Sequence, residues 1–235
     1  VQHALQLATR QVEAKYGRPG ASLTLLAFGS LGARNMRYGS DLDLVFLYSR
    51  EGATDRGVDH QEWYARLAQR LIGALGARLA EGRLYEIDTR LRPSGQQGML
   101  VTSIDAFRRY HRGAAAAWER LALLRARPIG EAPPELTEEI ARIVYEGPVD
   151  GAALSAELAR VRARMERERA AVGPGERHLR LGAGGLADVE FIAGLGQLLF
   201  GRDDPLLRTT AIAPALDRLA ARGWPDTTVA RDLLD

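Results

Sequence analysis

The chain carries two kinds of apolar pattern, one with a period of two residues and one with helical spacing. Residues 41–48 alternate strictly: the even positions are apolar or aromatic, and the odd positions begin with Asp41 and Asp43. Because successive side chains of a strand point to opposite faces, both aspartates lie on one face of a predicted strand. Residues 22–28 predict a second strand, and the alternating residues 84–92 predict a third.

Helical spacing covers most of the remaining chain. Trp63, Leu67, Leu71 and Leu75 recur every four residues and predict a helix over residues 60–80. Glycine and proline at 147–148 and 173–175 predict breaks between the later helices. The other predicted helices span residues 1–16, 104–127 (one helix or two), 136–145, 152–171, 185–200 and 206–222.

The order of these elements predicts the fold class. Residues 1–130 combine strands with helices, whereas residues 135–235 contain no predicted strand. Residues 128–134 hold prolines and a glycine and are the best candidate for a linker. We therefore predict an α+β fold, in which a small mixed β-sheet covered by helices is followed by an α-helical bundle.

The aspartate pair is the first candidate for chemistry. Two carboxylates a few ångströms apart repel each other unless a cation neutralises them, and a hard divalent ion such as magnesium prefers their oxygens. A bare Asp-x-Asp is more often a strand entrance with solvated acids. Here the second strand ends in Gly29 and Ser30, whose small side chains let backbone N–H groups approach a phosphate, and the acids follow about ten residues later. This combination favours a site for metal and phosphate.

A third acid fits the same picture. Glu86, Asp88, Arg90 and Arg92 share one face of the strand predicted for residues 84–92. If that strand lies beside the aspartate pair, Asp88 completes a three-carboxylate cluster able to hold two magnesium ions for in-line attack on a nucleotide phosphate. Arg90 and Arg92 would then supply positive charge for the triphosphate. The alternative is a surface strand whose mixed charges form weak salt bridges.

Longer strings resemble a known family. The Gly-Ser turn, the Asp-Leu-Asp and the later aspartate resemble the DNA polymerase β-type nucleotidyltransferase superfamily. Over roughly residues 25–224, the chain resembles the glutamine synthetase adenylyltransferase (glutamate-ammonia-ligase adenylyltransferase) family. The strings that carry this resemblance are LYEIDTRLRPSGQQGMLVTSIDAFRRYH, AWERLALLRARPIG and GAGGLADVEFIAGLGQLLFG.

The resemblance implies an architecture and a reaction. Members of the family have two homologous nucleotidyltransferase halves, one that attaches AMP to a tyrosine of glutamine synthetase and one that removes it by phosphorolysis. A single Gly-Ser and Asp-x-Asp block predicts that this chain is one half of such an enzyme, or a piece cut from it. We accordingly expect a nucleotidyltransferase catalytic domain at residues 1–130 and a helical bundle domain at residues 135–235.

The expected site follows from the residues and the resemblance together. Asp41, Asp43 and Asp88 are the predicted catalytic and metal-binding residues, with two Mg²⁺ ions and ATP as substrate. The predicted nucleotide-binding residues are Gly29, Ser30, Arg90 and Arg92. The family usually has a lysine where Ser30 stands, so one phosphate contact is missing here.

The resemblance also implies partners. Glutamine synthetase is the expected target, in a role in nitrogen regulation. Nitrogen-signalling proteins are possible regulators through the full-length enzyme. A cytoplasmic location is expected.

The direction of the reaction is left open between two halves. The strings SDLDLVFLY, RLRPSGQQGMLV and GGLADVEF resemble the adenylylating half, whereas LGAGG resembles the deadenylylating half. The first three favour AMP transfer to glutamine synthetase, with AMP removal as the alternative. A hypothesis of another class is a non-catalytic module that senses nucleotide or binds a partner. The presence of all three aspartates argues against it.

Composition excludes several kinds of site. The chain has no cysteine, so it has neither a disulfide nor a thiolate metal site. No apolar run approaches a membrane span. The net charge is only +2 and the arginines are scattered, which argues against nucleic-acid binding. His111 and His178 lack the spacing of a zinc site and are predicted to be surface residues.

Two acids in the second half of the chain keep two interpretations. Asp188 and Glu190 follow Gly184 and Gly185 at the start of a predicted helix. The glycine pair could bring Asp188 towards the nucleotide site. The acids could equally stabilise the positive end of the helix dipole.

Overall fold

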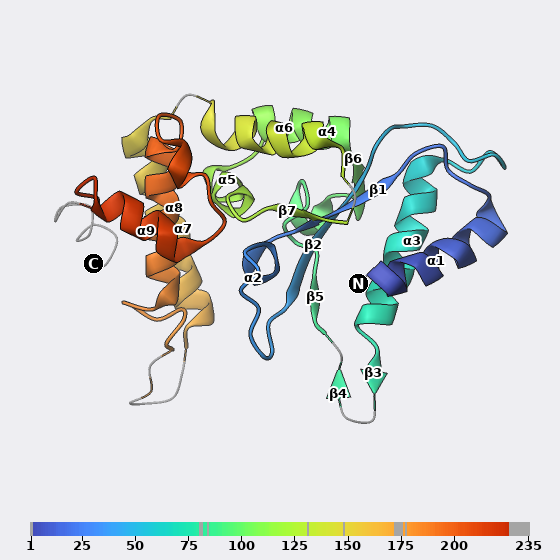
Figure 1. Ribbon diagram of the computed structural model, residues 1–235. Coiled ribbons are helices and arrows are strands. Elements are labelled where there is room, and N and C mark those ends of the chain that lie inside the picture. The colour runs from blue at the N-terminus through green and yellow to red at the C-terminus, as the bar shows by residue number, and fades with distance from the viewer. Residues whose placement is uncertain are drawn as a thin grey trace. The chain divides into compact units, whose positions relative to one another are not determined.

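The computed structural model (Figure 1) describes residues 2–79, 82–83, 85–130, 132–147, 149–171, 176 and 178–225. The chain divides into two compact units, and one of them is interrupted in sequence by the other. The first consists of Val1–Ala115 and Arg125–Ile140, and the second of Ala116–Leu124 and Ala141–Asp235. The expected linker at residues 128–134 therefore lies inside the first unit. The assignment of a catalytic domain to residues 1–130 stays a prediction.

The first unit is built on a small mixed β-sheet, which confirms the predicted fold class. Its central pair is β1 (Leu23–Ala27) and β2 (Leu42–Tyr48), which run antiparallel. The strand order is β5-β2-β1-β7, in which β5 (Ile87–Asp88) is parallel to β2 and β7 (Arg127–Ile129) is antiparallel to β1. A fifth strand, β6 (Val101–Ser103), also pairs with β2 in parallel.

One face of this sheet is covered by two helices, α1 (Gln2–Tyr16) and α3 (His60–Leu75) (Figure 1). The alternation in β2 explains the packing, because its even-numbered side chains all enter one apolar cluster with the helical stripe of α3. Trp63 at the centre is 1% exposed, and its indole Nε1 donates to the carbonyl of Gly17 at 2.9 Å. The odd-numbered residues of β2, including Asp43, therefore face the other side of the sheet.

Several predicted elements are shorter than expected. The helix predicted for residues 60–80 ends at Leu75, and a two-strand hairpin follows, β3 (Arg78–Leu79) with β4 (Gly82–Arg83). The strand predicted for residues 84–92 is wrong in length, because only β5 pairs within it. Residues 89–98 form a turn that includes a short 3-10 helix, Gly95–Gln97. Leu84 lies outside the described residues.

Residues 104–127, predicted as one helix or two, form two helices, α4 (Ile104–Gly113) and α5 (Ala117–Leu123). Only the end of the predicted range is wrong, because Arg127 begins the strand β7. Leu121 of α5 packs against α8 of the second unit, where a Cβ added at Gly194 would lie 2.3 Å from a Leu121 methyl carbon. This packing draws α5 out of the first unit, and β7 then returns to the sheet.

The regular elements in the described part of the second unit are all helices, and no strand was predicted beyond residue 135. Besides α5 the unit contains α7 (Gly151–Arg169), α8 (Leu186–Phe200), a 3-10 turn (Pro205–Leu207) and α9 (Ile212–Ala220), while α6 (Pro134–Tyr145) runs from the first unit into the second. The helix predicted for residues 206–222 is thus replaced by a 3-10 turn and a shorter helix. Pro148 and the predicted break at 173–175 lie outside the described residues. No helix in the described part of the chain is both long and apolar enough to span a membrane.

His111 of α4 is not the surface residue that the sequence suggested. Both of its ring nitrogens are buried and have no hydrogen-bond partner among the described residues, and its ring centre lies 4.3 Å from that of Phe107. Burial lowers the pKa of His111 to about 4. The imidazole is therefore neutral in the folded protein at pH values where an exposed imidazole would be charged.

This burial predicts a loss of stability in mild acid. The pKa of His111 rises from about 4 to an ordinary value near 6.5 on unfolding, so the unfolded chain binds the extra proton as the pH falls through this window. The free energy of unfolding should fall between pH 6.5 and pH 4, with a contribution from His111 on the order of 1–3 kcal/mol. Urea unfolding of the wild type and His111→Leu at pH 7 and pH 4.5 tests this. Equal pH dependence in the two proteins would contradict it.

Candidate active site

Asp43 lies directly against the Gly-Ser turn. Gly29 follows β1 with a φ of +51°, in the left-handed region that favours glycine. A Cβ added at this position would lie 2.3 Å from Oδ2 of Asp43, so a larger residue would displace the carboxylate. The backbone N–H of Phe28 donates to the carbonyl of Asp43 at 2.9 Å and fixes the strand beside the turn. The turn and the acid are thus held together as the sequence predicted.

The far side of this turn is fixed by β7. The turn forms a one-turn helix, α2 (Gly29–Gly32), and a Cβ at Gly32 would lie 1.9 Å from the carbonyl oxygen of Arg125. Arg127 donates from Nε to the carbonyl of Gly32 at 3.1 Å and from Nη2 to that of Leu31 at 3.0 Å. Desolvation, and next the nearby charge of Arg34, lowers the pKa of Arg127. Sequence reasoning missed Arg127, whose role depends on a pairing distant in sequence.

The register of β5 brings the third acid to the first two. Leu42 pairs with Ile87 and Asp43 with Asp88, and the N–H of Leu42 donates to the carbonyl of Glu86 at 2.8 Å. Paired residues of parallel strands point to the same face, so Asp43 and Asp88 share a face. Asp41 precedes β2 by one residue and is exposed, whereas Asp43 and Asp88 are partly buried. The two strands therefore lie side by side, which is the condition stated for a three-carboxylate cluster; the roles of the three acids stay predictions.

Arg90 neutralises this acidic face. Its Nε lies 2.9 Å from Oδ2 and 3.0 Å from Oδ1 of Asp88, its Nη2 also donates to Oδ2, and its backbone N–H donates to Oδ1 at 2.8 Å. The hydrogen bond and charge of Asp88, and then the charges of Asp43 and Asp41, raise the pKa of Arg90. One guanidinium therefore lies in the electrostatic field of all three acids.

The donor chemistry fits a hard divalent cation, because every candidate ligand is a carboxylate oxygen. In the residues that the structure describes, however, no three His, Cys, Asp or Glu side chains are placed to hold one metal ion together. The reason lies in the preceding contacts: Asp88 is turned onto Arg90. A metal shared by all three acids would require Asp88 to leave that guanidinium.

Arg92 has a different place from the one predicted for it. Its Nη1 donates to the carbonyl of Thr89 at 2.8 Å and to its hydroxyl at 2.9 Å, and its Nε donates to the carbonyl of Gly98 at 3.1 Å. The turn is tight, since a Cβ at Gly98 would lie 1.9 Å from the carbonyl oxygen of Pro93. In this arrangement Arg92 supports the turn that follows Asp88 and Arg90. Its contact with nucleotide stays a prediction.

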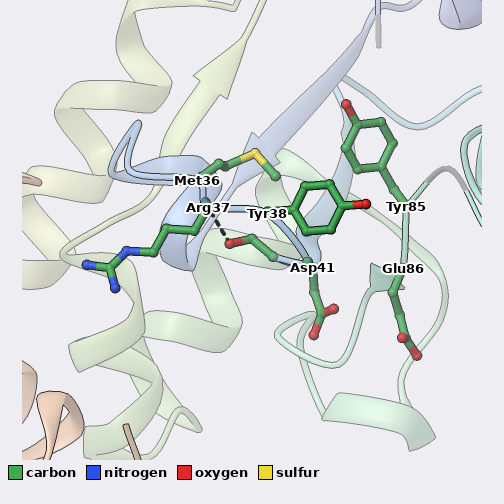
Figure 2. Close-up of a pocket in the computed structure, with 8 residues that line it drawn as sticks. Met36, Arg37, Tyr38, Asp41, Tyr85 and Glu86 are labelled. Carbon is green, nitrogen blue, oxygen red and sulfur yellow. Dashed lines mark hydrogen bonds between the residues drawn. The ribbon is translucent and has the colours of Figure 1, made fainter. Parts of the chain in front are cut away.

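A hollow of about 550 Å³ opens beside Asp41 (Figure 2). Tyr38 is fully exposed, and Tyr85 and Met36 are 41% and 37% exposed. The backbone N–H of Arg37 donates to the hydroxyl of Ser40 at 2.9 Å and holds the loop before Asp41. The hollow is lined by Met36, Arg37, Tyr38, Gly39, Ser40, Asp41, Tyr85 and Glu86.

Comparison with known proteins identifies the family. The family model described as glutamate-ammonia ligase adenylyltransferase matches residues 1–142, which contain the turn and all three aspartates. The chain belongs to this adenylyltransferase family.

Curated proteins named bifunctional glutamine synthetase adenylyltransferase/adenylyl-removing enzyme are similar over almost the whole chain. The protein from Xanthomonas axonopodis pv. citri is 40% identical over 98% of this chain, and that from Thioalkalivibrio sulfidiphilus is 38% identical over 100% of it. The one from Mesorhizobium japonicum is 38% identical over 99%. These alignments cover 26%, 26% and 24% of the relatives, so the chain spans about a quarter of their length.

The string GAGGLADVEFIAGLGQLLFG in the second unit contains one member of a buried ion pair. Asp188, near the start of α8, lies 2.5 Å from Nε of Arg162 on α7, and both side chains are at most 5% exposed. Arg162 also donates from Nη2 to the carbonyl of Gly182 at 3.0 Å. Sequence analysis left two interpretations of Asp188, compensation of the helix dipole and contact with the nucleotide. Dipole compensation alone does not account for this ion pair, and neither does a nucleotide contact. The acid joins two helices and the glycine-rich turn.

His178 belongs to the same turn. Its Nδ1 accepts from the backbone N–H of Leu181 at 3.1 Å and of Arg180 at 3.3 Å. A Cβ at Gly185 would lie 2.8 Å from the carbonyl oxygens of Arg180 and Gly182. The LGAGG string is therefore explained locally by a tight turn that only glycine fits.

The buried pair predicts an asymmetric response to mutation. Asp188→Ala leaves the guanidinium of Arg162 buried without its partner and should lower the free energy of unfolding by about 3–5 kcal/mol. Asp203→Ala, an exposed acid on the same unit, should change it by less than about 0.5 kcal/mol. Urea unfolding of both variants is the measurement. A double variant with Arg162→Met should recover much of the loss, and equal effects of the two single acid variants would refute the assignment.

Proposed function

We propose that the chain is a magnesium-dependent protein adenylyltransferase domain that transfers AMP from ATP to a tyrosine of glutamine synthetase. The observation that carries the proposal is the register of β5 on β2, which sets Asp43 and Asp88 on one face with Gly29 packed against Asp43. The reaction and the target are taken from the family and from the names of the relatives.

Each acid has a role in this proposal. Asp41 and Asp43 would hold magnesium together with the ATP phosphates, and Asp88 would share it and face the incoming hydroxyl. Bound magnesium neutralises charge on the phosphates and polarises the α-phosphate. Gly29 and Ser30 would bring backbone N–H groups to the phosphates. The rest of the rate enhancement would come from positioning of the reactants by the antiparallel pair β1–β2 and the Gly29 turn.

Arg90 would bring positive charge to the phosphates. Its ion pair with Asp88 holds the guanidinium at the acidic face. Charge-assisted hydrogen bonds from a guanidinium to a triphosphate are strong.

In the proposed transfer one P–O bond forms and another breaks. The tyrosine oxygen attacks the α-phosphorus and forms the new P–O bond, while the bond between the α-phosphorus and its bridging oxygen to the β-phosphate breaks. Pyrophosphate leaves with that electron pair. In this proposal Asp88 would orient the incoming hydroxyl, and its carboxylate would take the hydroxyl proton.

The reverse activity is the second candidate. The printed names of the relatives carry both adenylyltransferase and adenylyl-removing activities, and this chain spans about a quarter of them. In removal, inorganic phosphate would attack AMP-tyrosine and ADP would leave, with the same three aspartates. The strings SDLDLVFLY, RLRPSGQQGMLV and GGLADVEF favour transfer, and we propose that direction.

A non-catalytic nucleotide-sensing or partner-binding module remains the candidate of another class. Such a module could have the same fold, but it would not need three acidic residues grouped around an arginine. Glutamine synthetase is the partner in either case. Regulation by nitrogen-signalling proteins in the cytoplasm, through the longer enzyme, belongs to the same proposal.

Asp43→Asn tests the catalytic assignment. The variant should lose at least about 10²-fold in AMP transfer, the loss typical of removing one charge-stabilising group. Its melting temperature without magnesium should not fall, because the change relieves repulsion between acids. Calorimetry with ATP should show that magnesium strengthens binding to the wild type only. A variant that keeps more than about a tenth of the transfer would refute the metal role.

The direction has its own test. The chain should add AMP to unmodified glutamine synthetase when it is given ATP and magnesium, and should remove little AMP from the modified form when it is given phosphate. Intact mass spectrometry of glutamine synthetase after each incubation reads both reactions, and Asp43→Asn serves as the blank. Removal with phosphate and no gain with ATP would reverse the assignment.

A further inference from the structure

The hollow beside Asp41 has a defined place relative to β2. In the strand order β5-β2-β1-β7, β1 and the turn that follows it lie on one side of β2, and β5 lies on the other. The wall of the hollow comes from the loop before Asp41 and from Tyr85 and Glu86, which lead into β5. The hollow therefore lies at the start of β2, between the loop that joins the Gly29 turn to β2 and the two residues that lead into β5 on the other side of β2.

In-line displacement connects this placement to the reaction. The attacking and leaving oxygens lie on opposite sides of the phosphorus. With the β- and γ-phosphates at the Gly29 turn, as in the proposed function, pyrophosphate leaves towards β1. The attacking hydroxyl must then arrive from the side of β5.

We propose that this hollow is the acceptor subsite, which receives the ring of the target tyrosine against Tyr38, Tyr85 and Met36. The inference rests on the proposed function and extends it to the protein substrate. Figure 2 shows the side chains of Met36, Tyr38 and Tyr85 on the wall of this hollow. Aromatic rings and thioethers form favourable contacts with another aromatic ring.

The charges of the hollow favour the same occupant. The N–H of Leu42 donates to the carbonyl of Glu86, which continues the parallel register so that Asp41 and Glu86 are neighbours across the strands. Figure 2 shows both carboxylates on one side of the hollow. In the proposed function Asp41 is occupied by magnesium, so the charge argument rests on Glu86. A carboxylate that binds no metal repels a phosphate but accepts a hydrogen bond from a phenol. The Glu86 side of the hollow therefore favours an uncharged hydroxyl-bearing ring over a phosphate.

The exposed side chains that line the hollow favour a binding site over a packed interior. Large apolar side chains are usually exposed singly, whereas here Met36, Tyr38 and Tyr85 line one hollow. The volume of about 550 Å³ exceeds one ring and leaves room for the flanking backbone of the target. Because Tyr38 is fully exposed, its removal leaves the core intact.

The test separates acceptor binding from nucleotide binding. The probes are unmodified glutamine synthetase and ATP with magnesium, on the wild-type chain, Tyr38→Ala, Tyr85→Ala and Tyr38→Phe. The remote control is Leu179→Ala, whose side chain is 83% exposed in the second unit. Two readouts are taken: KM for each substrate in AMP transfer, and the Kd for glutamine synthetase by surface plasmon resonance without nucleotide.

We expect each alanine variant to raise the KM and the Kd for glutamine synthetase at least about tenfold, as for an aromatic anchor of an interface. KM for ATP should stay within about twofold. Tyr38→Phe should recover most of the acceptor affinity because it keeps the ring, and Leu179→Ala should resemble the wild type. If the chain works in the removing direction, the same pattern should hold for adenylylated glutamine synthetase.

The other outcomes are distinguishable. A rise in KM for ATP alone would make the hollow a nucleotide site and overturn the inference, as would alanine variants that behave like the wild type. A wild-type chain that binds glutamine synthetase but performs neither reaction refutes the proposed function, while a weaker Kd in Tyr38→Ala still supports the subsite. A wild-type chain that neither binds nor reacts overturns both.

Discussion

The contact on which the rest of the site depends is the approach of the Asp43 carboxylate to the backbone of Gly29. It requires a residue without a Cβ in a left-handed conformation at the end of β1, and an antiparallel partner that presents its odd-numbered residues to that turn. The even-numbered residues of β2 are locked into the core by α1 and α3. A slip of one residue would bury the acids and expose the apolar face, so the core that stabilises the unit also fixes the chemistry.

Arg90 places a positive charge at the acidic face. It follows Asp88 by two residues and donates to both oxygens of its carboxylate, and the charges of Asp43 and Asp41 act on its guanidinium as well. Arg92 holds the turn from which this pair projects, through bonds to Thr89 and Gly98. The two arginines of one short string therefore have different roles, one electrostatic and one structural. Repulsion between the like charges on this face is reduced by a side chain of the same segment.

The sequence predicted the sheet class, the Gly29 turn and most helix boundaries. These features depend on local periodicity, which one sequence shows directly. The placement of Asp88 beside Asp43 was only a condition of the predicted site, because it depends on a strand pairing distant in sequence. The sequence did not predict β6, β7 or the support of the turn by Arg127, because three-residue strands carry too little pattern and their partner strands lie far away in the chain. It also overextended the strand around Asp88. The charges do alternate along residues 84–92, but only Ile87 and Asp88 pair as a strand. The residues that follow form a turn, which Arg92 stabilises by a hydrogen bond to the carbonyl of Thr89.

The interruption of one unit by the other has a topological consequence. The chain passes between the units at three places, after Ala115, after Leu124 and after Ile140. No single cleavage can therefore separate two intact units. The strand that supports the Gly29 turn, β7, follows α5 after three residues, and α5 belongs to the other unit. Arg127, whose guanidinium donates to the carbonyls of Leu31 and Gly32, is therefore the first residue of the sheet after a helix of the other unit.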